Sequence, residues 1–300
     1  MRIGFVGLGN MGQGMADNLL SKKSDLTVFT RTKSKIDSMI KKGAKGANSL
    51  RELVNNVDVI MTCLPDVATS LDVILGNEGI ISYVRNNQII IDHSTVSVST
   101  SKKCNDELSK KNASFLDAPI SGGPTGASSG TLTIMVGGDK NVYEIANPYL
   151  SKMGTNVRYM GNSGAGTGMK LVNQLLVGVN TVAAAEAFAF ANKVGVDVNI
   201  ASELLSVSWG GSTMVERSAP ITKDRNFPNS PAPVRNVDKD LKIIIEFAKE
   251  NKLSLDLTKI SLNMFSELMN DNKSEYDIAG VIEIIEKNSK NLWSHLKKTN

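Results

Sequence analysis

The chain has 300 residues, 41% of them hydrophobic and 21% charged, which suits a globular protein of one large or two medium domains. The net charge of +4 comes without an arginine-rich cluster interleaved with aromatic residues, so nothing indicates a nucleic-acid partner. Only Cys63 and Cys104 are present, without a CxxC pair, which argues against a disulfide framework or a zinc site. No apolar run approaches the ~18 residues of a membrane span, and the chain begins in a predicted strand without a signal peptide. We therefore expect a cytoplasmic protein with no membrane partner.

The first motif in the chain is Gly7-x-Gly9-x-x-Gly12, between an apolar run and a helical pattern over 11–20. This arrangement predicts a strand, a tight turn and a helix, with Gly9 letting the backbone approach a pyrophosphate at the helix N-terminus. The alternative is a glycine turn that only packs a strand against a helix. The residues predicted to bind a dinucleotide here are Gly7, Leu8, Gly9, Asn10, Met11 and Gly12.

The second predicted strand, 26–30, bears on which dinucleotide is bound. A site for NAD places an acidic residue ~20 residues beyond the glycines, where it bonds the ribose hydroxyls. This chain instead has Thr30, Arg31, Thr32 and, a little further on, Lys35. A guanidinium, two hydroxyls and an ammonium suit a 2′-phosphate better, so we expect NADP rather than NAD. The alternative is that Arg31 only stacks on the adenine.

Strands and helices alternate as far as residue 160. Further strands are predicted at 58–65, 88–92, 114–117, 131–137 and 156–160, and helices at 34–42, from Asn48-Ser49 to 56, and at 67–75, 98–111 and 141–153. This alternation predicts a mostly parallel, doubly wound sheet, whose ligands bind beyond the carboxyl ends of the strands. Leu64-Pro65, Ser94-Thr95 and Ser121-Gly122-Gly123 all fall at or just past such ends.

The pattern changes after Gly161. An apolar stretch over 169–194 predicts one buried central helix, longer than the ordinary helix of ~11–12 residues. Other helices are predicted at 197–207, 213–219, 238–251, 255–271 and 277–287, with an irregular loop at 224–235. We therefore expect an α/β Rossmann-type domain over 1–161 that binds NADP, followed by an all-helical domain over 162–300 for substrate binding and oligomerisation.

Lys170 is the residue whose surroundings most suggest chemistry. It lies early in the long apolar helix, and Asn173 follows three residues later on the same helical face. Desolvation lowers the pKa of a lysine, so a general acid/base is one reading; a lysine that extends to the surface is the other. These residues alone leave the choice open.

Three other features have weaker signals. Ser121-Gly122-Gly123 offers a hydroxyl and backbone N–H groups that suit a carboxylate, although an ordinary turn has the same composition. Lys239-Asp240 begins a predicted helix, where a charged pair is usually solvated. His93, at a strand end, is a conceivable proton donor, but Asp92 and Ser94 compete for the inward position.

Taken together, the motifs resemble those of the β-hydroxyacid dehydrogenase family, which includes 3-hydroxyisobutyrate dehydrogenase and tartronate semialdehyde reductase. The matching blocks occur in the family's order and span residue 1 to about 290. They are the cofactor signature over 5–19, the substrate signature over 117–123 with the run 130–138, the catalytic-helix block over 164–174, and Lys239-Asp240-Leu241.

The resemblance implies a role for each block. It makes Lys170 the catalytic general acid/base, with Asn173 orienting the substrate beside it and His93 a bystander. It also implies that Ser121, Gly122 and Gly123 hold the substrate carboxylate, that Leu64 and Pro65 line the cofactor site, and that Thr95 and Lys239 lie near the nicotinamide or the substrate. Arg31-Thr32 resembles the NADP-preferring branch, which includes glyoxylate and succinic semialdehyde reductases.

One segment departs from the family pattern. Arg235 and Asn236 are polar where relatives tend to be apolar, in a segment that borders the substrate pocket of those relatives. The family therefore implies an NADP-dependent enzyme that acts without a metal on a small 3-hydroxy acid or its semialdehyde, as a homodimer or homotetramer, but not which substrate it takes.

Three alternative classes of protein fit parts of this pattern. Imine reductases share the fold but generally lack a lysine at position 170, and decarboxylating 6-phosphogluconate enzymes carry a histidine where Asn173 stands. A non-catalytic cofactor-binding module would have lost the lysine that this chain keeps.

Overall fold

The structure is a computed structural model that describes the backbone of residues 1–296 and the side chains of residues 1–289. The chain forms two units, Met1–Leu171 and Val172–Asn300, which divide within the long helix α8 (Ala165–Lys193). We still propose that the domain boundary lies after residue 161. Helix α8, which belongs to the predicted helical domain, begins only four residues later.

The first unit is built on a mostly parallel sheet, as the sequence predicts. Its strand order is β3-β2-β1-β4-β5-β6-β8-β7, with β9 paired to β8. Strands β1 to β6 are parallel, whereas β8 runs antiparallel to β6 and β7. The strands are β1 (Ile3–Val6), β2 (Leu26–Phe29), β3 (Lys45–Gly46), β4 (Val59–Thr62), β5 (Ile89–Asp92), β6 (Ser114–Asp117), β7 (Ile120–Ser121), β8 (Leu132–Gly138) and β9 (Gly154–Gly161).

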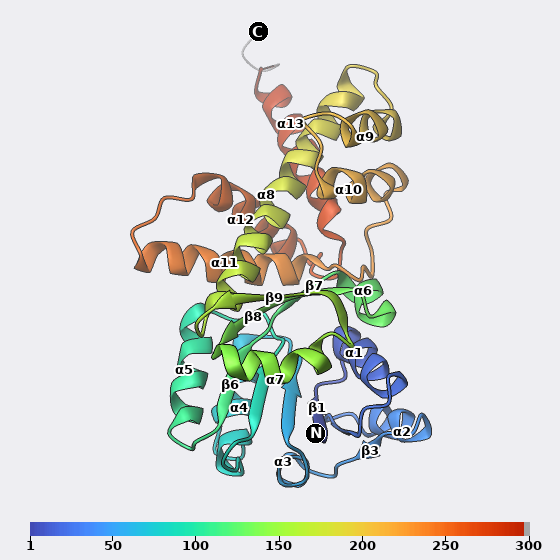
Figure 1. Cartoon of the computed structure of the whole chain (residues 1–300). Helices are drawn as coiled ribbons and strands as arrows, with labels where there is room; N and C mark the ends of the chain where they lie inside the picture. The colour runs from blue at the N-terminus through green and yellow to red at the C-terminus, as the bar shows by residue number, and fades with distance from the viewer. Residues whose placement is uncertain (297–300) are drawn as a thin grey trace. The chain divides into compact units, whose positions relative to one another are not determined.

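Helices cover both faces of this sheet (Figure 1). Because side chains alternate along a strand, Phe5 and Met61 point to one face and Val6 and Ile60 to the other. The first face packs against α1 (Asn10–Ser21), α2 (Lys33–Lys41) and α7 (Lys140–Leu150), and the second against α3 (Leu50–Asn56), α4 (Val67–Leu75), η1 (Ile80–Ser82) and α5 (Val98–Ser109). This confirms the predicted doubly wound architecture.

The sequence did not predict the short helix α6 (Gly123–Ser129), which follows the Ser-Gly-Gly segment. Its seven residues include two glycines and a proline, a composition that reads as a loop. Packing on α1 explains the helix, because a Cβ on Gly14 would lie only 2.8 Å from the backbone of Ala127. The two-residue strands β3 and β7 were also missed, since runs this short carry no periodic signal.

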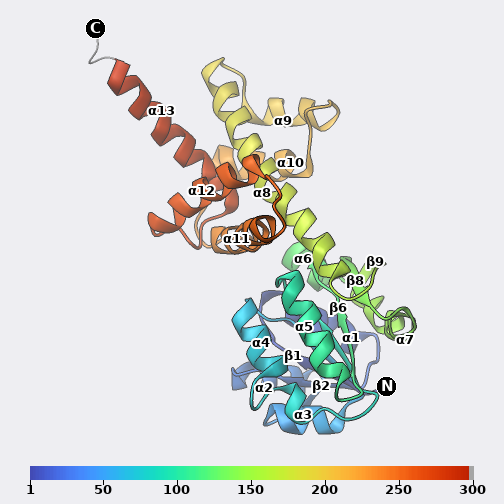
Figure 2. The ribbon, with the colours of Figure 1, turned by 90° about the vertical axis from the view of Figure 1, so that its left-hand side faces the viewer.

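The regular secondary structure of the second unit's described residues is helical, as expected, apart from an isolated bridge between Pro233 and Asp277 (Figure 2). It contains α9 (Val198–Ser206), α10 (Thr213–Asp224), α11 (Val234–Glu250), α12 (Asp256–Asn270), η2 (Ile278–Val281) and α13 (Ile282–Leu296). Helix α11 begins four residues earlier than predicted, because carbonyls of Tyr276 and Ser274 accept the N–H groups of Val234 and Arg235. Helix α10 continues past the predicted end at residue 219, through Pro220.

Helix α8 is less buried than the sequence suggested. Val182, Ala185 and Phe188 are buried in the core, but Val172 and Phe190 are mostly exposed. An 18-residue window of α8 has a mean hydropathy of 1.4, so the helix could cross a membrane by length and composition alone. The expectation that no apolar stretch approaches such a length was therefore too strict. Core helices of globular proteins are often as long and as apolar as this one. In α8, 39% of the window is buried.

Candidate active site

The glycine turn after β1 leaves one side of the backbone open. A Cβ on Gly7, whose φ is +97°, would lie 2.4 Å from the Cys63 carbonyl oxygen, and one on Gly12 would lie 1.9 Å from that of Gly7. These two glycines are therefore required by packing. A Cβ on Gly9 would meet no atom within 4 Å, so no neighbour in the described chain explains this glycine.

The start of α1 suits an anion. Its N-cap residue, Gly9, offers no side chain, and no acidic residue lies in its first turn. A phosphate would therefore meet N–H groups and the positive end of the helix dipole without a competing carboxylate. Gly9, Asn10 and Met11 are exposed or half-buried, whereas the Leu8 side chain is buried beneath the turn. This cradle fits the pyrophosphate of a dinucleotide.

The loop after β2 adds cationic groups beside this turn. Thr30 is half-buried, and Arg31 and Thr32 are exposed. Within the described side chains Arg31 has no carboxylate at ion-pair distance, and the Thr32 hydroxyl does not cap α2 although Thr32 is its N-cap residue. Lys35 reaches back from α2, and its Nζ donates to the Leu8 carbonyl at 2.8 Å. The loop after β2 and the glycine turn after β1 therefore lie at the same edge of the sheet.

A buried aspartate supports the loop that follows β4. Ser94 Oγ accepts the Leu64 N–H at 2.9 Å and donates to Asp92 Oδ1 at 2.5 Å. Thr62 Oγ1 donates to the same carboxylate oxygen at 2.8 Å. Leu64 is thereby tied to the end of β5, next to half-buried Thr95, while Pro65 is exposed. The predicted cofactor residues of β4 and β5 therefore lie at the carboxyl edge of the sheet.

Two ionisable side chains at this edge are unsuited to proton transfer. Burial lowers the pKa of His93 to about 4, although a bond to the Ala118 carbonyl opposes the shift. Its Nδ1 lies 2.7 Å from that oxygen, so the neutral ring donates there. Burial, with the charge of Asp92, raises the pKa of the Cys63 thiol to about 12. Neither group changes charge near neutral pH.

The Ser121-Gly122-Gly123 segment joins β7 to α6. Gly122 and Gly123 have φ values of +128° and +63°, which a residue with a side chain rarely adopts. A Cβ on Gly123 would again meet nothing within 4 Å. Asn18 of α1 holds this region in place, because its side-chain nitrogen lies 2.8 Å from the Ala127 carbonyl of α6.

Lys170 lies in the second turn of α8 and is only 7% exposed. The helix starts at the same sheet edge, because the carboxylate of Asp117 at the end of β6 accepts two of its first N–H groups. These bonds run from Gly164 at 2.8 Å and from Thr167 at 2.7 Å. Burial raises the pKa of Asp117, although the bonds from Gly164 and Thr167 oppose the shift.

The predicted site residues of the second unit form one polar network. Asn173 Nδ2 donates to Gln174 Oε1 at 3.0 Å, and Gln174 Nε2 donates to Asp240 Oδ2 at 2.5 Å. Lys239 Nζ lies 2.9 Å from Asp240 Oδ1. A Cβ on Gly178, one turn beyond Gln174, would lie 2.9 Å from Leu241 Cδ1, so this glycine permits the close approach of α11. Asn173 and Lys239 are thus linked through Gln174 and the buried carboxylate of Asp240.

The structure therefore brings the predicted residues of the first unit to one edge of its sheet, and the two of the second unit into one network. Sequence reasoning missed the residues that hold them. Asp92 and Asp117 had a signal, since each is an acidic residue closing a buried strand. Asn18 and Gln174 had none, because their partners lie far along the chain.

The polar segment that departs from the family pattern is exposed. Arg235 Nε lies 2.6 Å from Glu275 Oε1, and its Nη1 donates to Asn236 Oδ1 at 2.9 Å. Both side chains of the ion pair are about half exposed. The departure thus places a solvated ion pair in the first turn of α11.

Comparison with known proteins agrees with this geometry. Residues 2–161 match the family model for the NAD-binding domain of 6-phosphogluconate dehydrogenase, and residues 164–285 match the model for the NAD-binding region of NADP-dependent 3-hydroxyisobutyrate dehydrogenase.

Similar proteins cover nearly the whole chain. A 3-hydroxyisobutyrate dehydrogenase of Pseudomonas aeruginosa is 33% identical over 88% of this chain and 91% of its own. Glyoxylate/succinic semialdehyde reductase 2 of Arabidopsis thaliana is 32% identical over 94% and 79%. The crystal structure of a 3-hydroxyisobutyrate dehydrogenase from Salmonella typhimurium superposes with a TM-score of 0.85 at 28% identity, covering 95% of this chain and 99% of that one.

The fold, the glycine cradle and these matches define an oxidoreductase with a nicotinamide dinucleotide cofactor. More narrowly, the chain belongs to the β-hydroxyacid dehydrogenase family, whose members are NAD(P)-dependent 3-hydroxyacid dehydrogenases and semialdehyde reductases.

Proposed function

We propose that the protein transfers a hydride between NADP(H) and a small 3-hydroxy acid or its semialdehyde, with Lys170 as general acid/base. The observation that carries the proposal is the burial of Lys170 in α8, whose start is bonded to the sheet edge that also bears the glycine cradle. Lys170 thus lies near the carboxyl ends of the strands, where ligands of doubly wound sheets bind.

The proton is the part of the reaction that this chain handles. In the reducing direction Lys170 Nζ donates a proton to the carbonyl oxygen of the substrate, which becomes a hydroxyl. The positive charge of the ammonium also stabilises negative charge that develops on that oxygen. In the oxidising direction the neutral amine takes the hydroxyl proton back. The bound nicotinamide supplies the hydride in one direction and accepts it in the other.

The other site residues bind and orient. We propose that the Ser121 hydroxyl and the N–H groups of Gly122 and Gly123 hold the substrate carboxylate. The positive φ values and the open space beside Gly123 support this role. Asn173 orients the substrate, and Lys239 contacts substrate or nicotinamide; the buried Asp240 that links them supports a shared task.

We propose that the cofactor is held along the carboxyl edge of the first unit. Gly7 to Gly12 bind the pyrophosphate, and Leu64, Pro65 and Thr95 line the nicotinamide half. Thr30, Arg31, Thr32 and Lys35 bind the adenosine half and favour NADP over NAD, which the exposed cations and the lack of a carboxylate after β2 support.

The substrate class follows from the names of relatives. Similar proteins are named for 3-hydroxyisobutyrate, glyoxylate and succinic semialdehyde, all small molecules with a carboxylate. A screen of NADPH oxidation with glyoxylate, succinic semialdehyde, methylmalonate semialdehyde and tartronate semialdehyde would identify the best substrate. No turnover with any of them would favour a non-catalytic module or an imine reductase.

Replacing Lys170 tests the proposal. Lys170→Met keeps the bulk of the side chain and removes its charge and proton. General acid/base action contributes ~10²–10⁴-fold and loss of charge stabilisation adds to this, so turnover should fall at least about a thousandfold. NADPH binding, followed by fluorescence, should persist. Lys193→Met, the same change at the exposed end of α8, is the control and should keep native turnover. A Lys170→Met enzyme with a tenth of native turnover would contradict the assignment.

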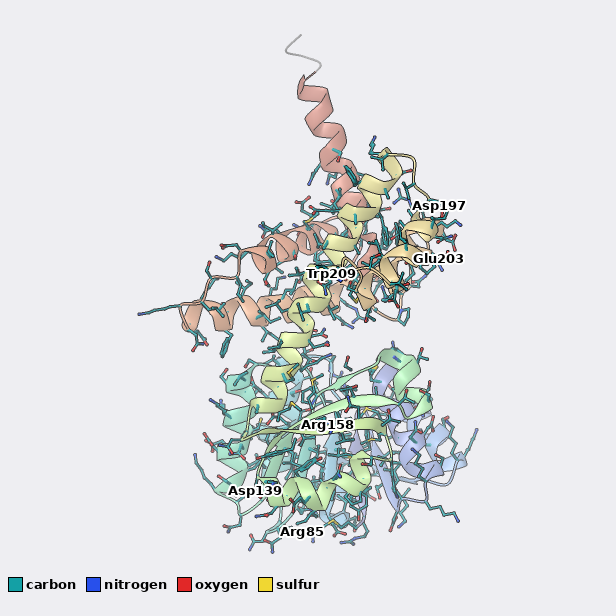
Figure 3. All side chains as sticks on the ribbon, turned by 45° about the horizontal axis from the view of Figure 1, so that its top comes forward. Arg85, Asp139, Arg158, Asp197, Glu203 and Trp209 are labelled. Carbon is teal, nitrogen blue, oxygen red and sulfur yellow. The ribbon has the colours of Figure 1, made fainter. Side chains whose placement is uncertain are left out.

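We also propose that the protein is a cytoplasmic homodimer or homotetramer. Phe190, Ile200, Leu204 and Val207 of the second unit are mostly exposed, and Trp209, in the loop after α9, is fully exposed (Figure 3). Apolar surface of this kind usually marks an interface between proteins. Both cysteines are unpaired, as is usual in a reducing compartment.

A further inference from the structure

The start of α8 is held by a carboxylate from a distant part of the chain. The first N–H groups of a helix need acceptors from outside its own hydrogen-bond pattern. Near the start of α8 the chain supplies one, the Asn162 carbonyl, which accepts the Ala165 N–H at 2.9 Å. The N–H groups of Gly164 and Thr167 instead donate to the two oxygens of Asp117, about 50 residues earlier in the chain.

The contact is unusually constrained. Asp117 is the last residue of β6 and is 1% exposed, so it cannot move without disturbing the sheet. Each oxygen of the carboxylate accepts one N–H, and its charge faces the positive end of the helix dipole. A Cβ on Gly166 would lie 2.3 Å from the Met135 carbonyl oxygen and 2.5 Å from that of Asp117. The helix start therefore packs directly against the end of β6 and the second half of β8.

A second contact fixes the rotation of the helix about its axis. Thr167 Oγ1 lies 2.8 Å from Ser101 Oγ of α5, and both residues are buried. Lys170 follows Thr167 by three residues, so its side chain leaves the same side of the helix one turn later. Any shift in the first turn of α8 would therefore displace the lysine as well.

We propose that Asp117 is a positioning residue for Lys170. Its carboxylate sets the axial position and rotation of the first turn of α8, and thereby the place of the lysine Nζ relative to the reacting oxygen. This inference rests on the proposed function of Lys170. It assigns to Asp117 no contact with substrate or cofactor.

The main test is Asp117→Asn in the full-length protein. The amide keeps the shape but replaces one acceptor with a donor, which faces a backbone N–H, and removes the charge. A displacement of ~1 Å in a catalytic group can cost about 100-fold, so kcat should fall on the order of 10–100-fold. The NADPH dissociation constant should change less than about 2-fold, because the glycine turn is unaltered. A variant with native kcat would overturn the proposal.

A double-mutant cycle separates positioning from general damage to the fold. In the Lys170→Met background no lysine remains to be misplaced, so Asp117→Asn should not lower the residual single-turnover rate further. An equal loss in both backgrounds would overturn the positioning role while leaving the role of Lys170 intact. If Lys170→Met itself retained turnover, the proposed function would fail first, and the positioning role with it.

A second pair of variants tests the same bond from the helix side. Thr167→Pro removes the N–H that Asp117 accepts, at a position in the first turn where proline is tolerated. Thr167→Val keeps that N–H and removes the hydroxyl, with its contacts to Ser101 and Asp117, which the proline variant also loses. The proline variant should have a kcat at least about 5-fold below that of the valine variant. Equal values would contradict the proposal, even if Asp117→Asn did not fold.

Discussion

We expect the enzyme to prefer NADP over NAD, and we expect Arg31 to carry that preference. In the structure Arg31 is exposed between β2 and α2, and no carboxylate of the described residues pairs with it. Thr32 begins α2 without capping it, and no acidic residue lies in the first turn. A 2′-phosphate would therefore meet a guanidinium, a hydroxyl and a positive helix end together.

The size of the effect follows from this exposure. A hydrogen bond between charged groups is worth ~1.5–3 kcal/mol, but solvent screening at an exposed site favours the lower end of that range. Since ~1.4 kcal/mol corresponds to tenfold, Arg31→Ala should lower kcat/KM for NADPH by about 10–30-fold. The value for NADH should change by less than about 3-fold. Arg31→Asp should reverse the preference, because a carboxylate repels the phosphate and accepts ribose hydroxyls.

Steady-state kinetics at low and moderate salt would measure kcat/KM for NADPH and for NADH in each variant. The KM for NADPH should rise with ionic strength in the native enzyme and less so in Arg31→Ala. Arg158→Ala is the matched control. Arg158 is an exposed arginine on β9, which pairs with β8 toward the end of the sheet opposite β2. The reasoning would be refuted if the native enzyme used NADH as efficiently as NADPH, or if both alanine variants lost NADPH efficiency equally.

Three further predictions concern stability, binding and assembly. Burial alone would raise the pKa of Asp277, but bonds from Arg217 and others leave it below its usual value. The ionised carboxylate therefore stabilises the fold above pH ~4, and this stabilisation is lost as the pH falls through the pKa of the folded state. In urea unfolding, Asp277→Asn should lower the free energy of unfolding by about 3 kcal/mol at pH 7, and the difference should shrink below pH 4. Ser94→Ala, which frees the Leu64 N–H, should weaken NADPH binding about 5-fold by fluorescence titration, and an unchanged affinity would contradict the role of this support. Leu204→Asp should shift the assembly toward monomer in light scattering, whereas a monomeric native protein would disprove the interface.

The parts of the fold that sequence reasoning found, and the site residues that it proposes, are those with local signals. The glycine turn is read from three glycines within six residues, and the alternation of strands and helices from short periodic patterns. Arg31 stands out because it lies where a site for NAD has an acidic residue, ~20 residues beyond the glycines. Lys170 is conspicuous because its neighbours are apolar. Each of these inferences needs only a window of about twenty residues.

What the sequence could not predict depends on pairing between distant segments. Helix α6 has a loop composition and is stabilised by its contact with α1. Helix α11 begins early because carbonyls of Ser274 and Tyr276 accept its first N–H groups. The exposure of α8 depends on which of its apolar faces the other helices cover. None of these contacts has a pattern in the residues that make it.

Two buried aspartates show how this limitation bears on function. Asp92 and Asp117 are paired in register at the ends of neighbouring strands β5 and β6. Asp92 accepts the Ser94 hydroxyl that holds the backbone of Leu64, and Asp117 accepts the N–H groups that begin the helix of Lys170. A carboxylate in a strand end is usually read as a candidate for catalysis. Here both carboxylates accept bonds from hydroxyl or backbone donors, and we propose that their charge places other residues rather than taking part in the reaction.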